Sequence, residues 1–173
     1  MATPAKAKAN TVRPLDAREE AAWRALGRAI VVLPRVLEAD LLESDGLNLA
    51  DYSVLMNLSE VPDRTLRMNE LADMVALTVS GLTRVVDRLA REGLVERVRA
   101  EDDRRGQLAV LTDAGFDRLT KAYPHHLESV RRRVVDHLEG LDLVAFASAV
   151  GGIAAGEPGP ALRPRPAGSR RAD

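Results

Sequence analysis

The residues NELADMVALTVSGLTRVVDRLAREGLVERVRAEDDRRGQLAVLT at positions 69–112 decide the fold of this chain. Apolar residues first recur at the three- and four-residue steps of a helix and then form two short runs that are typical of strands. The polar segment AEDDR joins these runs and predicts a hairpin tip. The pattern predicts, in order, a helix over about Asn69–Val75, a helix capped by Thr78 and ended by Gly93, and strands over Leu94–Arg99 and Gln107–Leu111.

Two further helices are expected before this stretch. Asp16 and Glu19 have the spacing of a capping box that opens the first one. Pro34 is expected to kink or split that helix, and Asn48 caps the next. The VPDRT segment at 61–65 predicts a turn. The first helix carries a stripe of apolar residues, namely Trp23, Leu26, Ile30, Leu33 and Leu37.

Two helices are also expected after the hairpin. Thr112 caps a long one, in which Pro124 predicts a kink near residues 120–123. A last helix is expected over about Asp142–Ile153. The long helix carries an apolar stripe made of Phe116, Leu119, Tyr123, Leu127, Val130, Val134 and Leu138. The fold class is therefore mainly α with a small β-hairpin wing.

The composition limits both the domain organisation and the chemistry of the chain. Its 173 residues suffice for one domain with a real core, which we expect over 15–155, with disordered segments at 1–14 and 156–173. The absence of cysteine excludes disulfides, thiolate metal sites and cysteine redox switches. With no long apolar run and no secretory signal, we expect a cytoplasmic protein without membrane partners. The net charge of −1 gives no support for nucleic-acid binding, so such binding requires a local cluster of arginines.

The helix that starts at Thr78 has the pattern of a helix that reads DNA. One face is apolar and must be buried, whereas the other begins with small residues and continues with arginines one turn apart. Small residues let a backbone approach base edges, and arginines reach guanine or phosphates. A merely solvated face is the alternative. The candidate contacts on this helix are Thr78, Val79, Ser80, Gly81, Thr83, Arg84 and Arg88.

The hairpin tip supplies three more candidates, Asp103, Arg104 and Arg105. A carboxylate at position 103 can orient the guanidinium at position 105 through a bidentate pair. An arginine so placed can reach a narrow minor groove, where the negative potential is enhanced. An ordinary polar hairpin with a surface ion pair is the alternative.

Together these motifs resemble the MarR family of winged-helix transcriptional regulators. The resemblance rests on residues 66–98, on DDRRGQLAVLTDAG at 102–115 and on GLNLADYSVLMNL at 46–58, and it extends over roughly Asp16–Ile153. It implies a winged helix-turn-helix at about 47–112, flanked by dimerisation helices at about 16–45 and 113–154. Met68 departs from the Thr or Ser that is frequent in this segment of the family.

The resemblance further implies a ligand-responsive repressor that binds a palindromic double-stranded DNA operator as a homodimer. The helix from Thr78 to Arg91 would enter the major groove and Arg105 the minor groove. A small apolar anion would act as effector, at a site whose residues the sequence does not identify. The long apolar stripes independently favour a dimer, because a monomer rarely exposes so much apolar surface.

Other functions have less support. A winged-helix module that binds proteins without DNA needs an acidic or apolar face, which the residues 80–91 do not provide. No nucleophile–base pair or phosphate loop predicts an enzyme, and no cofactor is expected. The spacing of His125, His126 and His137 does not suit a metal site, so we expect surface histidines. Trp23 and Tyr52 could line an effector pocket, but helical phase favours packing. The sequence does not identify the operator or the regulated genes, and it does not show whether binding represses or activates transcription.

Overall fold

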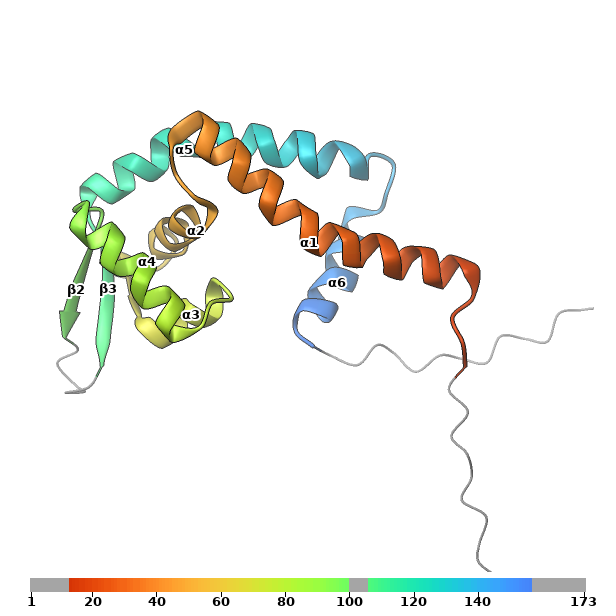
Figure 1. Cartoon of the computed structure of the whole chain (residues 1–173), viewed down its shortest axis with the longest axis horizontal. Helices are drawn as coiled ribbons and strands as arrows, with labels where there is room; N and C mark the ends of the chain where they lie inside the picture. The colour runs from red at the N-terminus through yellow and green to blue at the C-terminus, as the bar shows by residue number, and fades with distance from the viewer. Residues whose placement is uncertain (1–12, 100–105, 157–173) are drawn as a thin grey trace, which may run out of the picture. The chain divides into compact units, whose positions relative to one another are not determined.

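The computed structural model describes residues 13–99 and 106–156 (Figure 1). Its contacts divide the chain into two compact units, Met1–Arg133 and Val134–Asp173, which are described separately. The single domain expected over 15–155 therefore stays a prediction. The expected fold class is confirmed, because the described residues form helices with one small three-stranded sheet.

The first unit begins with the long helix α1, Ala17–Asp45. Asp16 caps it in the predicted capping box, with its carboxylate accepting from the backbone of Arg18 and Glu19. Gly46 ends it in the left-handed conformation at a φ of 62°. Helix α1 continues through Pro34, so the helix is not split there, and the alternative of a kink stays a prediction. The helix thus tolerates the loss of the one backbone hydrogen bond that a proline inside a helix cannot donate.

The central elements of the unit follow in the predicted order, with one addition. The helices are α2 (Leu49–Ser59), α3 (Met68–Met74) and α4 (Val79–Arg91). The predicted turn at 61–65 is a short 3-10 helix, η1 (Pro62–Arg64), that leads into the strand β1 (Thr65–Arg67). Strand β1 was not predicted, because a three-residue strand is too short to show an alternating pattern.

The predicted hairpin is confirmed and belongs to a three-stranded antiparallel sheet. Strands β2 (Val95–Arg99) and β3 (Gln107–Leu111) pair with each other, and β1 pairs with the other edge of β3. Val95 lies opposite Leu111 and Arg99 opposite Gln107. Helix α5, Asp113–Arg133, follows at once and contains Pro124 without a break. In Figure 1 the ribbons of α1 and α5 run together near the C-terminal end of α1.

The core of the unit lies between α2, α3, α4, the sheet and the first turns of α5. Its fully buried side chains include Leu55, Leu58, Leu71, Leu82, Val86 and Leu89. In the helix expected over about Asn69–Val75, spacing predicts burial of Ala72 and Met74. Ala72 is buried, but Met74, at the end of α3, is 50% exposed, so its predicted burial is wrong. Trp23 is 63% exposed in the described residues. The stripe on α1 therefore lacks a covering layer over its N-terminal half.

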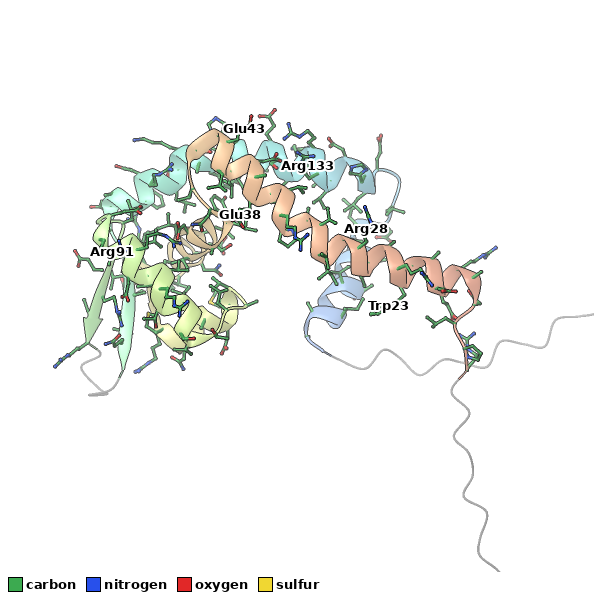
Figure 2. The ribbon with its side chains drawn as sticks, viewed as in Figure 1. Trp23, Arg28, Glu38, Glu43, Arg91 and Arg133 are labelled. Carbon is green, nitrogen blue, oxygen red and sulfur yellow. The ribbon has the colours of Figure 1, made fainter. Side chains whose placement is uncertain are left out.

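Helices α1 and α5 are joined by ion pairs around Asp40 of α1. Arg133, labelled in Figure 2, donates to Asp40 at 2.9 and 3.0 Å, and Arg132 donates at 3.1 Å. Ser129 also donates to this carboxylate. The hydrogen bonds from Arg133 and Ser129 hold the pKa of Asp40 well below its usual range. This cluster stabilises the contact between the two helices where their polar faces meet.

The second unit contains the 3-10 helix η2, Val135–Leu138, and the helix α6, Leu143–Ala154. Helix α6 confirms the helix expected over about Asp142–Ile153, and Asp142 caps it by accepting from the backbone of Val144 and Ala145. The apolar stripe predicted to continue in one helix to Leu138 is interrupted, because α5 ends at Arg133 and Val134 has a non-helical φ of −131° with ψ at −65°. Helix α6 is rich in apolar residues, yet none of them is buried within the unit.

Within the described residues, no single helix is both long enough and apolar enough to cross a membrane. The segment Asp113–Leu138 and the helix α6 satisfy that test only when they are taken together, by length and composition alone.

Gly115, in the first turn of α5, allows this helix to pass close to the chain before β2. A Cβ there would lie 2.1 Å from the carbonyl oxygen of Leu94 and 2.7 Å from Leu111 Cδ1. We expect Gly115→Ala to lower the free energy of unfolding by at least about 2 kcal/mol, because the backbone must shift. Gly27→Ala is the control, since nothing lies within 4 Å of its Cβ position and alanine favours helix by up to about 1 kcal/mol. Urea unfolding that shows equal stabilities for both variants would contradict this packing.

Candidate nucleic-acid interface

The first turn of α4 consists of small side chains that stay near the surface. Thr78 caps the helix, with its Oγ1 accepting from the backbone N–H of Gly81 at 3.1 Å. Ser80 Oγ lies 3.2 Å from the same oxygen. A Cβ at Gly81 would lie only 3.1 Å from Thr78 Oγ1, so glycine protects the cap as well as reducing bulk. The turn therefore has the low profile that insertion into a major groove requires.

The opposite face of α4 fixes the direction in which this turn points. Leu82, Val86 and Leu89 are completely buried, and Val85 is almost so. These four residues have the i, i+3, i+4, i+7 spacing of one helix face, so together they form the apolar face that the sequence predicts. In Figure 1, α4 lies beside β2 and close to α3, in agreement with its contacts to both elements. The exposed face of α4 is therefore directed away from the core.

The three arginines of the predicted row on α4 have different surroundings. Arg84 is exposed, and its side chain forms no hydrogen bond or ion pair within residues 13–99 and 106–156. Arg91, labelled in Figure 2, is exposed and donates to the carbonyl of Asp87 in its own helix at 3.3 Å. Arg88 is only partly exposed and bonds to a neighbouring helix. Arg84 is therefore the arginine best placed to reach a base edge.

Arg88 is held by Asp51 of α2. The Asp51 residue is only 5% exposed, and its Oδ2 accepts from Arg88 Nε at 3.2 Å and from Asn48 Nδ2 at 2.8 Å. Arg88 Nη2 donates to Oδ1 at 2.5 Å. The hydrogen bonds from Arg88 to Asp51 raise the pKa of the guanidinium. Through this pair, Arg88 fixes the orientation of α4 on α2. The contact of Arg88 with DNA stays a prediction.

Arg97 of β2 connects the hairpin to α4. Its guanidinium forms an ion pair with Asp87 of α4 and donates to the side-chain oxygen of Gln107 on β3. Asp87 is exposed on the same helix as Arg84, where an unpaired carboxylate would repel DNA phosphates. Arg97 therefore neutralises that charge and sets the hairpin against the helix.

A cavity of about 390 Å³ lies where α3, α4 and the base of the hairpin meet. It brings the predicted residues Val79 and Thr83 together with residues that the sequence analysis did not select. The lining residues are Arg67, Met68, Asn69, Val79, Thr83, Gly106 and Gln107. The starts of two helices and the base of the hairpin thus form one concave surface.

The predicted candidates at the hairpin tip, Asp103, Arg104 and Arg105, lie outside the described residues. Their ion pair and minor-groove contact stay predictions. The candidates on α4 share one helix, and all but Arg88 lie on its exposed side. The residues missed by the sequence analysis are Asp51 and Arg97. The first was visible only as part of a helix start, and the second only as one of several charges in a strand.

The rings of Tyr52 and His126 contact each other in a tilted arrangement, with 40° between their planes, where α2 meets α5. Their ring centroids are 4.2 Å apart. Tyr52 is buried, which confirms its packing role, and burial raises its pKa to about 12. Burial lowers the pKa of His126, whose Nδ1 is buried without a hydrogen-bond partner in the described structure. The prediction of a surface histidine is therefore wrong for His126, because its imidazole ring packs against the ring of Tyr52.

His125 is exposed as predicted, and its Nδ1 lies 3.1 Å from both carboxylate oxygens of Asp45, near the C-terminal end of α1. Across the described parts of the chain, no three His, Asp or Glu side chains are grouped so that they could hold a metal ion.

Comparison with known proteins identifies solved structures of the same fold. A sequence model of the MarR family matches residues 45–106. AbsC, a MarR family transcriptional regulator from Streptomyces coelicolor, is 38% identical with a TM-score of 0.75, over 84% of this chain and 97% of AbsC. Sco3205, a MarR family transcriptional regulator from the same organism in complex with DNA, is 35% identical with a TM-score of 0.76, over 83% of this chain and 93% of Sco3205.

Curated relatives match over a shorter region. The HTH-type transcriptional repressor YetL of Bacillus subtilis is 33% identical over 85 residues, which is 49% of this chain and 51% of YetL. The HTH-type transcriptional regulator PrsX of Escherichia coli is 30% identical over 95 residues, or 53% of this chain and 57% of PrsX. The chain thus spans about half the length of the curated relatives it matches.

The different surroundings of Arg88 and Arg84 predict different effects on stability. We expect Arg88→Ala to lower the free energy of unfolding by about 1–3 kcal/mol, because it leaves the buried Asp51 carboxylate without its cation. Arg84→Ala is the matched control and should change it by less than about 0.5 kcal/mol. Asp51→Asn in the Arg88→Ala background should recover part of the loss, as measured by urea unfolding. Equal stabilities of the two single variants would show that the ion pair does not hold α4.

Proposed function

Because the chain belongs to the MarR family of transcriptional regulators, we propose that it is a sequence-specific DNA-binding regulator that binds a palindromic operator as a homodimer. The observation that carries this proposal is the exposed first turn of α4, with Arg84 beyond it and the hairpin beside it. The relative Sco3205 was solved in complex with DNA, which supports DNA as the partner.

Charge on the exposed side of α4 supports the same partner. Arg97 neutralises Asp87, and Asp51 is paired with Arg88, so Arg84 and Arg91 determine the charge of the remaining face. A local positive surface is sufficient for phosphate attraction even though the whole chain has a net charge of −1. We assign Arg84 to a base edge in the major groove and Arg105 to the minor groove.

Exposed apolar residues in each unit support a homodimer. In the first unit, α1 exposes Trp23, Ile30, Val31 and Val32. In the second unit, α6 exposes Leu143, Val144, Phe146 and Ile153, with Val144 at 82%. Large exposed apolar side chains that gather on a helix are typical of surfaces that bind another protein. A two-fold dimer would bury the same residues in both copies and would present two α4 helices to a symmetric site.

We further propose that the chain acts in the cytoplasm as a repressor of transcription that responds to a ligand. The name of YetL as a repressor supports this direction of regulation. The relatives are transcriptional regulators, so we propose no enzymatic activity for this chain. A module that binds proteins instead of DNA is the alternative. The unpaired Arg84 and the small polar groups on the exposed side of α4 favour DNA over a protein partner.

Arg84 provides the test of base reading. We expect Arg84→Ala to weaken operator binding by about 1–3 kcal/mol and to relax specificity at one base pair, because a bidentate contact with guanine is lost. Binding would be measured by titration of labelled duplexes that carry each base at each position. Arg105→Ala should weaken binding more evenly across sequences. Arg28→Ala on α1, far from α4 in Figure 2, is the matched control. Unchanged affinity of both variants at positions 84 and 105 would refute the assignment.

Helix α6 provides the test of assembly. We expect the native chain to sediment as a dimer at micromolar concentration, and Val144→Glu to shift it toward the monomer, because the new charge would be buried in the interface. Thr120→Glu introduces the same charge at an exposed position of α5 and is the control. A native chain that remains monomeric at these concentrations contradicts the proposed dimer.

A further inference from the structure

An apolar patch lies at the start of α4, on the side proposed to face DNA. Val79 is the first residue of the helix, and its side chain is 55% exposed. Thr83 lies one turn later, and its Oγ1 donates to the carbonyl oxygen of Val79 at 2.8 Å. The hydroxyl proton of Thr83 is therefore already used, so this side chain can offer a ligand its methyl group and an acceptor oxygen but no hydrogen-bond donor. Both residues line the cavity beside the hairpin base, with Met68 as a third apolar wall.

This patch differs from an ordinary surface valine in its neighbours. A single exposed apolar residue needs no explanation by itself. Here, however, the next two residues are Ser80 and Gly81. Because their side chains are small, they do not prevent a partner from reaching Val79. The patch belongs to the turn whose backbone would come nearest to base edges. A ligand at this place must therefore be recognised partly by apolar contact.

We infer that Val79, together with the Thr83 methyl group, recognises the 5-methyl group of thymine in the major groove. Thymine is the base that presents a methyl group there, and apolar side chains discriminate it by contact. Arg84 follows Thr83 directly and is suited to guanine, so α4 would read a thymine and a guanine within each half-site. The inference rests on the proposed function and specifies the chemistry of its target.

The contact has a measurable size. Burying one methyl group against a valine changes affinity by about fourfold, from the free energy of about 0.8 kcal/mol per buried methylene. Replacing thymine by deoxyuridine removes this methyl group and leaves the Watson–Crick pairing groups unchanged. The effect can therefore be separated from any contact that Arg84 makes with a neighbouring base.

The experiment starts with the full chain and a pool of random duplexes, from which bound sequences are selected. In the tightest duplex, each thymine is replaced in turn by deoxyuridine, and the affinity is measured at fixed salt. We expect one or two positions in each half-site at which the native chain binds about fourfold more weakly. Val79→Ala should bind the unmodified duplex more weakly and should lose this sensitivity to deoxyuridine.

Variants at position 83 provide a matched pair. Thr83→Val keeps a methyl group and removes the hydroxyl, whereas Thr83→Ser keeps the hydroxyl and removes the methyl. We expect Thr83→Val to retain the deoxyuridine effect and Thr83→Ser to reduce it. Thermal unfolding of each variant serves as the control for folding, since Val79 is largely exposed and its truncation should leave the midpoint nearly unchanged.

Three outcomes overturn the inference. The first is strong binding that no deoxyuridine substitution weakens, which leaves DNA recognition intact but removes its thymine contact. The second is an equal deoxyuridine effect in the native chain and in Val79→Ala, which assigns the methyl group to another residue. The third is failure to select any duplex, which refutes the proposed function as well.

Discussion

The buried carboxylate of Asp51 is the constraint on which the orientation of α4 depends. A charged group that is only 5% exposed must be paired, because an isolated carboxylate in the interior is strongly unfavourable. Arg88 and Asn48 provide the partners, and they come from α4 and from the cap of α2. Since Arg88 bonds through both Nε and Nη2, α4 cannot rotate about its axis without breaking this pair. The small first turn and Arg84 are thereby presented in one direction.

Much of this arrangement could be predicted from the sequence, because its signals are local. Helix caps use residues within four positions of one another, so Asp16, Asn48 and Thr78 were identified correctly. The buried face of α4 also follows from spacing alone. By contrast, Arg88 and Asp51 are 37 residues apart, and helical phase cannot show whether an arginine on the exposed side meets a neighbouring helix. The same reason explains why the link from Arg97 to Asp87 was not foreseen.

Periodicity has a second limit, which the long helices illustrate. The stripes on α1 and in the C-terminal region predict surfaces that a partner covers, but periodicity does not identify that partner. Trp23 is exposed, and no residue of α6 is buried. Proline does not end either long helix, because α1 and α5 continue through Pro34 and Pro124. In α5, packing against α1 and the ion pairs at Asp40 supply stabilisation that a local rule does not count.

Charge and shape have separate roles at the candidate interface. Long-range attraction to phosphates depends on the arginines that remain unpaired, and it weakens with added salt. It cannot distinguish sequences, because every base pair carries the same backbone charge. Discrimination between base sequences requires short-range contacts with base edges. These contacts become possible only where small side chains let the helix backbone come close to the bases. The fold achieves this by placing Gly81 and Ser80 between Val79 and Arg84, so that an apolar group and a cation extend beyond a bare turn. The pairing of Asp87 with Arg97 then matters twice, since it removes a repulsive charge and holds the hairpin beside that turn.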